Sequence, residues 1–278
     1  MSEPARIAVL IPCYRDEGLA LEAVHSVQED EPIEIAIIDD HSDVPATETV
    51  LLALEAEGVT VLRHDSNQGP AAARATGLKA TSAPYVFPLD SDDLAIPGVL
   101  GRMADALDDR PDADVCYGDY VEFGESALTR AVPTVIDPYR LAYTNEYPVS
   151  ALFRRRVLDA VGGWAPLRAY EDWHLWMTLA ERGSTGVHMG AGVVTYRRRL
   201  HGSRLLTASK RLHPELYARL KNDHPRLFAS LAAHRKRSDL HRARKLLYPI
   251  VYGGRRRFGW ETRVKAGLDK VGVWTLRR

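Results

Sequence analysis

The stretch "YVFPLDSDDLAIPG" (residues 85–98) joins an apolar run to three carboxylates. The run is typical of a buried strand, and Asp90, Asp92 and Asp93 follow where the strand would end. Two unit charges about 5 Å apart at an effective dielectric of about 20 repel by about 3 kcal/mol. A helix cap explains one of these acids, but three together favour a divalent cation, Mg²⁺ or Mn²⁺, which takes oxygen ligands.

Short apolar runs alternate with helical patterns on both sides of this stretch. We expect strands over residues 6–12, 33–39, 59–64, 85–89 and 113–123, and helices over 17–30, 46–58, 69–81, 97–109 and 170–183. The alternation predicts an α/β fold with a mostly parallel central sheet flanked by helices. Such sheets bind ligands at the carboxyl ends of their strands. Cys13, Asp39 and Asp90 stand at such ends.

The second half of the chain is less regular. Residues 124–144 have little periodicity and favour a mobile or acceptor-binding loop. From about residue 207 the pattern is helical, with breaks expected at Pro214, Pro225 and Pro249. We therefore predict two domains, residues 1–206 around the sheet and residues 207–278 as a helical C-terminal extension.

The net charge of zero hides an asymmetry. Residues 234–278 hold 14 Lys and Arg against 3 Asp and Glu, a charge of +11, so residues 1–233 carry −11. Three interpretations stay open for the basic extension: helices packed on the first domain, peripheral contact with anionic lipid, or a homo-oligomer contact. Nucleic acid is disfavoured as a partner because the acidic body would oppose it.

The sequence also bears on the compartment. Cys13 and Cys116 make neither a disulfide framework nor a metal-ligand pair, which suits a reducing environment. The first residues lack the pattern of a signal peptide, and no apolar run reaches about 18 residues. We expect a cytoplasmic protein, free or at the inner face of the membrane.

Two further stretches combine turn residues with groups that could bind a nucleotide. "IIDDHSD" (residues 37–43) suits either a turn or a carboxylate that binds a nucleoside. In "SNQGPAAARATGLKAT" (residues 66–81), Gly69 precedes a helix and either serves the turn alone or cradles phosphate through backbone N–H groups. Arg74, one turn further on, could reach a phosphate or an acid of residues 85–98.

Acids and a basic turn mark the later part of the first domain. "GGWAPLRAYEDWHLWMTL" (residues 162–179) places Glu171 and Asp172 in the first turn of an apolar helix, where acids also favour the helix dipole. Nearby Trp164, Trp173 and Trp176 suggest a partly dry pocket that would raise a carboxylate pKa toward that of a general base. "RRRLHGS" (residues 197–203) is either a solvated basic face or a site that neutralises a diphosphate.

Taken in order, these motifs resemble family 2 glycosyltransferases of the GT-A fold. The resemblance covers about residues 6–205 and rests on "IPCYRDEG", "IIDDHSD", "NQGPAAARATG", "LDSDD", "GGW" and "YEDWHLWMTL". It implies a metal-dependent, inverting transfer of a sugar from a nucleotide-sugar, usually a UDP-sugar, to a hydroxyl acceptor in cell-surface glycan or glycolipid synthesis. A sugar nucleotidyltransferase is the alternative enzyme, although the Gly-rich loop it needs after the first strand is missing. An inactive, glycosyltransferase-like binding protein is the non-enzymatic alternative.

The resemblance also assigns roles. Asp172 would be the catalytic base, with Glu171 the lesser candidate. Asp92 would bind the metal, and Asp90 the metal or the ribose. The other residues implied in donor or metal binding are Pro12, Tyr14, Asp40, Arg199 and, as a metal ligand, His201. Arg15, His41 and Ala75 depart from the family pattern, which usually has Asn, Gly and Asn at these places.

Overall fold

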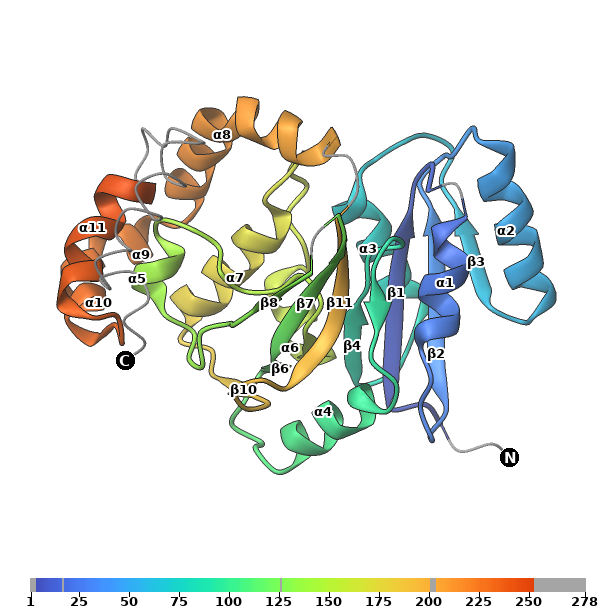
Figure 1. Ribbon diagram of the computed structural model, residues 1–278, viewed down its shortest axis with the longest axis horizontal. Coiled ribbons are helices and arrows are strands. Elements are labelled where there is room, and N and C mark those ends of the chain that lie inside the picture. Colours follow the sequence, from blue (N-terminus) through green and yellow to red (C-terminus); the bar gives the residue numbers. More distant parts are fainter. Residues whose placement is uncertain (1–3, 17, 126, 201–203, 253–278) are drawn as a thin grey trace. The chain divides into compact units, whose positions relative to one another are not determined.

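The computed structural model describes residues 4–16, 18–125, 127–200 and 204–252, and these form two compact units (Figure 1). The first unit comprises residues 1–135, 148–172 and 185–202, and the second comprises residues 136–147, 173–184 and 203–278. The division differs from a single boundary at residue 206, because two short segments from the middle of the chain join the second unit.

A seven-stranded sheet forms the centre of the first unit, in the order β10-β6-β9-β4-β1-β2-β3. Its strands are β1 (Ile7–Cys13), β2 (Ile33–Asp39), β3 (Thr60–Arg63), β4 (Tyr85–Pro88), β6 (Val115–Tyr117), β9 (Leu152–Arg154) and β10 (Gly186–His188). All neighbours pair in parallel except β9, which is antiparallel to both β4 and β6. The mostly parallel α/β sheet expected from the sequence is therefore confirmed.

Helices cover both faces of this sheet, as Figure 1 shows. They are α1 (Leu19–Ser26), α2 (Pro45–Ala56), α3 (Pro70–Ala80), α4 (Val99–Asp108) and α6 (Arg155–Val161). Alternate residues of β1 point to opposite faces, and Ile7, Val9 and Ile11 join one core with buried residues of α1, α2 and α4. Leu10 lies on the other face beside α3. Burial on both faces explains why these strands read as continuous apolar runs.

A smaller sheet of order β5-β11-β7-β8 lies in the same unit. Its strands are β5 (Leu94–Ala95), β7 (Asp119–Gly124), β8 (Leu128–Arg130) and β11 (Val194–Leu200). The single strand predicted over residues 113–123 was wrong, because the chain changes sheets at Gly118. A Cβ at Gly118 would lie 2.7 Å from Thr195 Cγ2 and 2.8 Å from the Val193 carbonyl oxygen, so only glycine fits this crossing.

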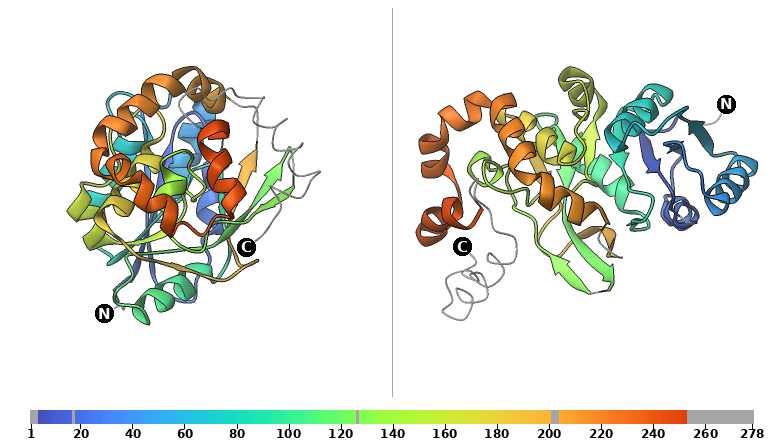
Figure 2. Two further views of the ribbon diagram at one scale, coloured as in Figure 1. Left: turned by 90° about the vertical axis from the view of Figure 1, so that its left-hand side faces the viewer. Right: turned by 90° about the horizontal axis from the view of Figure 1, so that it is seen from above.

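The second unit is helical. It contains α5 (Pro138–Leu141), most of α7 (Glu171–Arg182), α8 (Arg204–Asp223), α9 (Pro225–Ala229), α10 (Leu231–Arg237) and α11 (Arg242–Tyr252), and Figure 2 shows the last four in orange to red. Pro225 begins a helix as expected, but α8 and α11 continue through Pro214 and Pro249. Packing offsets the lost backbone hydrogen bond, since Tyr217 and Leu220 follow the first proline and are buried, as is Tyr248 beside the second.

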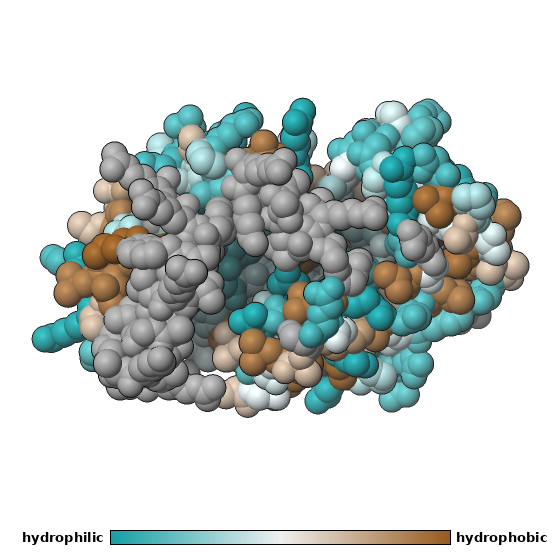
Figure 3. Space-filling view, turned by 45° about the horizontal axis from the view of Figure 1, so that its top comes forward, coloured by the Kyte–Doolittle hydropathy of each residue, from teal (hydrophilic) through white to brown (hydrophobic). Residues whose placement is uncertain are grey.

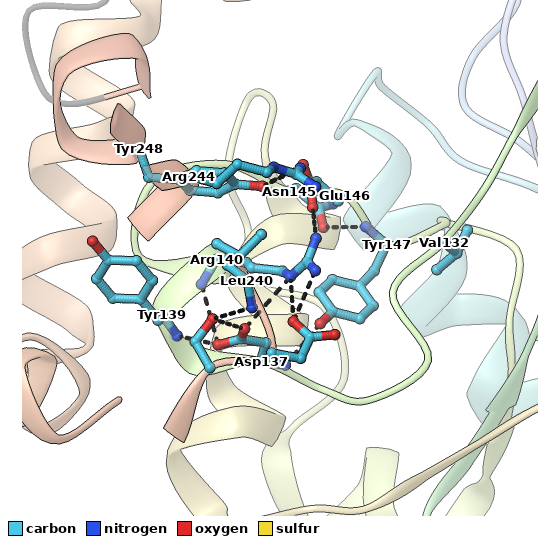
Figure 4. A network of polar contacts seen from close by, with 12 residues as sticks. Val132, Asp137, Tyr139, Arg140, Asn145, Glu146, Tyr147, Leu240, Arg244 and Tyr248 are labelled. Carbon is cyan, nitrogen blue, oxygen red and sulfur yellow. Dashed lines mark hydrogen bonds and ion pairs between the residues drawn. The ribbon is translucent and has the colours of Figure 1, made fainter. Parts of the chain in front are cut away.

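Residues 136–147, which overlap the loop expected over residues 124–144, hold α5 and an extensive polar network (Figure 4). Arg140 bonds to Glu146 at 2.7 Å and to Asp239 at 2.8 Å, and Tyr248 donates to the other oxygen of Glu146 at 2.7 Å. Burial disfavours the charged guanidinium, but Glu146 and Asp239 outweigh it and raise the pKa of Arg140. The network ties α5 to the segment that joins α10 to α11.

No helix within residues 4–252, apart from the short undescribed gaps, is both long and apolar enough to cross a membrane.

Candidate active site

The three acids after β4 converge in the structure. Asp90, Asp92 and Asp93 each offer a carboxylate oxygen, and these atoms lie within 4.8 Å of one another. Asp90 and Asp92 are partly exposed, whereas Asp93 is 4% exposed. Three hard oxygen donors at this spacing suit Mg²⁺ or Mn²⁺, so the residues present fit the metal that the sequence predicts.

Asp93 has a second part in this loop. Its carboxylate accepts a hydrogen bond of 2.8 Å from the backbone N–H of Arg199, and its own N–H donates to the Asp90 carbonyl. Burial, followed by the nearby charges of Asp90 and Asp92, raises the pKa of Asp93 well above its usual value. Asp93 therefore supports the turn while it also adds to the acidic cluster.

Arg199, at the end of β11, is held beside the same loop. Its Nε donates to the Asp92 carbonyl at 3.0 Å, its second terminal nitrogen pairs with Glu22 at 2.6 Å, and its guanidinium stacks on Phe123. Arg199 of the predicted basic turn thus lies in strand β11 and is brought to the acidic cluster. His201, predicted as a metal ligand from the same turn, lies outside the described residues.

Arg74 joins the acidic cluster to the beginning of α7. Its side chain is 2% exposed, and its two terminal nitrogens donate to Asp90 at 2.6 Å and to Glu171 at 2.9 Å. Burial by itself would lower the pKa of Arg74. The nearby carboxylates of Asp90 and Glu171 have the larger combined effect, so the pKa of Arg74 is raised. Of the two partners that the sequence allowed for Arg74, a phosphate or an acid, the structure shows the acid.

The two acids of the "YED" motif differ in their surroundings. Glu171 is 8% exposed and tied to Arg74, whereas Asp172 is partly exposed at the next position of α7. Trp164, Trp173 and Trp176, the aromatic residues expected around them, are at most 4% exposed and so offer little ring surface to a ligand. Their effect on the pKa of a carboxylate stays a prediction.

Asp40, after β2, has hydrogen-bond partners within the protein on both of its carboxylate oxygens. One carboxylate oxygen accepts from the Gln68 N–H at 2.8 Å and lies 2.8 Å from His64 Nδ1, and the other accepts from the Gly69 N–H at 2.6 Å. At 3% exposure, Asp40 anchors the turn before α3. Its predicted contact with a nucleotide base stays a prediction that would have to coexist with these bonds.

The same bonds decide between the alternatives for Gly69. Its φ of +88° favours glycine, and its N–H points to a protein carboxylate, not to an open anion site. The turn interpretation therefore describes Gly69 better than the phosphate cradle. Sequence reasoning missed His64, which bridges Asp40 and Thr76 Oγ1, although its place at the end of the strand predicted over residues 59–64 was a signal.

The end of β1 presents the remaining predicted donor-binding residues. Pro12 lies in the strand, and Tyr14 follows it with 44% of its surface exposed. Arg15 takes a left-handed backbone conformation, stacks its guanidinium against the Tyr14 ring and pairs with Asp43 at 2.5 Å. An exposed aromatic ring thus stands at the carboxyl edge of the sheet, next to the strand that ends at Asp39.

Comparison with known proteins finds sequences and structures that this chain resembles. The model of the family described as Glycosyl transferase family 2 matches residues 8–173. An uncharacterized glycosyltransferase of Rickettsia conorii is 29% identical over 193 residues, which are 65% of this chain and 31% of that protein. The chain thus spans about a third of the length of this relative. The succinoglycan biosynthesis protein ExoO of Rhizobium meliloti is 28% identical over 221 residues, 72% of this chain and 63% of that protein.

Solved structures share the fold. S. aureus TarS 1-349 in complex with UDP-GlcNAc superposes with a TM-score of 0.66 at 18% identity, over 97% of this chain and 78% of that one. The mannosyltransferase PcManGT from Pyrobaculum calidifontis, in complex with GDP-Man and Mn²⁺, gives 0.60 at 17% identity, over 97% and 76%. At these identities the likeness establishes the fold, which is that of GT-A glycosyltransferases.

Proposed function

Because the chain belongs to glycosyl transferase family 2, we propose that it transfers a sugar from a nucleotide-sugar to a hydroxyl group of an acceptor, with inversion at the anomeric carbon. A UDP-sugar is the favoured donor, and synthesis of a cell-surface glycan is the favoured setting. ExoO, named for succinoglycan biosynthesis, and TarS, crystallised with UDP-GlcNAc, support these choices.

The observation that carries the proposal is the bridge made by Arg74. Asp90 belongs to the acidic cluster and Glu171 to the start of α7, and one buried guanidinium holds both. The bridge holds Asp90, a proposed metal ligand, and Glu171, the residue before the proposed base Asp172, to one side chain. A donor diphosphate and an acceptor hydroxyl must meet at such a place for transfer to occur.

Asp172 is our proposed general base. Glu171 is buried and already accepts a hydrogen bond of 2.9 Å from Arg74, so we assign it to holding Arg74 in place. Asp172 is more exposed and would remove the proton of the acceptor hydroxyl as it attacks the anomeric carbon. This assignment agrees with the preference that the sequence suggested.

Asp90 and Asp92 would hold Mg²⁺ or Mn²⁺, which would supply charge stabilisation on the diphosphate leaving group. Arg199, fixed beside Asp92, would add a positive charge on the same side once its guanidinium turns from Glu22. Tyr14 would pack on the nucleotide base through its exposed ring.

The test is donor turnover by the full chain and by Asp172→Asn. Purified protein with Mn²⁺ and a panel of UDP-, GDP- and dTDP-sugars should release nucleoside diphosphate from one class. Asp172→Asn should abolish transfer while donor binding, measured by calorimetry, survives. Asp159→Asn, an exposed acid on α6, is the matched control and should behave as wild type.

Three results would count against the proposal. Pyrophosphate formation from a sugar phosphate and a nucleoside triphosphate would indicate a sugar nucleotidyltransferase instead. Near-wild-type turnover by Asp172→Asn would remove the base assignment, and a protein that binds donors without any turnover would be a binding protein.

A further inference from the structure

The last described helix, α11, has one buried face and one exposed face. Tyr248 and Val251 are buried, whereas Leu246 and Ile250 are 60% and 63% exposed. These two are the most exposed large hydrophobic side chains among the described residues. They are four positions apart, so they lie on the same side of the helix, and Arg242 lies one turn earlier on that side. An apolar stripe with a cation at its end thus faces solvent.

The neighbouring helix contributes further positive charge. No residue of α10 is buried, and Arg235, Lys236 and Arg237 are exposed at its end. Residues 231–252 hold six Lys and Arg against one acid, Asp239, which is bound to Arg140. Arg235, Lys236, Arg237 and Arg242 form no ion pair with another described residue. Figure 3 shows hydrophobic side chains gathered at the left-hand end of the view, on the side where Figure 1 draws α10 and α11.

We propose that α10 and α11 form a docking surface for a membrane with anionic lipids. Basic side chains are attracted to the negative surface potential, and exposed aliphatic side chains enter the boundary between headgroups and acyl chains. Charge complementarity favours this occupant, because a second copy of the same surface would bring like charges together. Of the interpretations of the basic extension, this proposal takes contact with anionic lipid and assigns it to α10 and α11, before residue 253.

The inference concerns where the protein works, and it does not depend on the sugar that the site transfers. Its residues belong to the second unit, and none is part of the proposed catalytic site. Loss of docking should therefore leave transfer to a water-soluble acceptor unchanged. A failure of the transferase proposal would show in turnover, and a failure of the docking proposal would show in vesicle binding.

The experiment is co-sedimentation of the full chain with phosphatidylcholine vesicles, with and without phosphatidylglycerol. Wild type should bind the anionic vesicles more tightly, and added salt should weaken binding. Leu246→Ser with Ile250→Ser, and Arg235→Gln with Lys236→Gln and Arg237→Gln, should each lower the partition constant about tenfold or more. Leu52→Ser, which removes a similarly exposed leucine from α2, is the control and should bind as wild type.

Three outcomes would overturn the inference. The first is that wild type does not bind anionic vesicles. The second is that the aliphatic and basic variants both bind as wild type does, which would mean that another part of the chain makes the contact. The third is that sedimentation velocity shows self-association of wild type, and that Leu246→Ser with Ile250→Ser makes the protein monomeric without changing its binding to vesicles. Unchanged urea unfolding of each variant would exclude misfolding as the cause of a loss.

Discussion

Two strand ends of the central sheet carry almost the same local sequence and use it differently. After β2, Asp39 and Asp40 accept backbone N–H groups from Ser42, Gln68 and Gly69, so their oxygens hold loops of the protein. After β4, oxygens of Asp90, Asp92 and Asp93 converge within 4.8 Å. Backbone donors account for much of the difference: Asp39 and Asp40 receive N–H groups and anchor loops, and so does Asp93, whereas Asp90 and Asp92 are the acids that we propose to hold a cation.

Arg74→Met should have the largest effect, because it removes the residue that joins the β4 end to α7. Glu171 would remain buried without its cation, and breaking a buried pair in this way costs about 3–5 kcal/mol. Transfer should also fall below detection. Urea unfolding and donor turnover would measure both.

A double variant isolates the cause. If the buried charge is responsible, Arg74→Met with Glu171→Gln should recover a large part of the lost stability. A double variant as unstable as the single one would point to lost packing of Arg74 against Trp164 instead.

Asp92→Asn should come next, because it removes a charge from the proposed metal site. Turnover should drop about 10²–10³-fold, as is typical when one electrostatic contact at a reacting centre is lost. Mn²⁺ should raise the melting temperature of wild type and not of this variant, since binding to the native state stabilises it. An equal Mn²⁺ effect in both proteins would remove Asp92 from the metal site.

Asp40→Ala should act mainly on stability. The N–H groups of Gln68 and Gly69 and the His64 ring would lose their acceptor, at a cost of about 1–3 kcal/mol. The Mn²⁺ effect should persist, and Asp43→Ala, an exposed acid of the same loop, should unfold as wild type does. Unchanged unfolding with a large loss of donor affinity would instead support the nucleotide-binding role that the sequence predicts.

Thr76→Val should have the smallest effect. It removes only the partner of His64 Nε2, at 2.9 Å, and a single hydrogen bond of this kind contributes about 1 kcal/mol. Differential scanning calorimetry would detect the shift in melting temperature. No shift would mean that Asp40 alone fixes the His64 ring.

Much of the fold followed from the sequence, and the exceptions have physical causes. The strands of residues 7–63 and the helices between them were predictable, because each is an apolar run or an amphipathic repeat of ordinary length. The split at Gly118 was not, because it depends on how closely Thr195 approaches from a distant strand. The continuation of α8 and α11 through proline depends on the buried residues that follow Pro214 and accompany Pro249.

The sequence by itself determined the α/β class, the family and the set of acids that compete for the chemistry. Local patterns suffice for these, since strand periodicity and acidic residues at strand ends are visible along the chain. Only the tertiary structure decided which partners each acid has. Arg74 reaches Glu171 across 97 positions and Arg199 reaches Asp93 across 106, and no local pattern reveals such pairs. Where a carboxylate's donors come from distant segments, its role depends on the packing that brings them together.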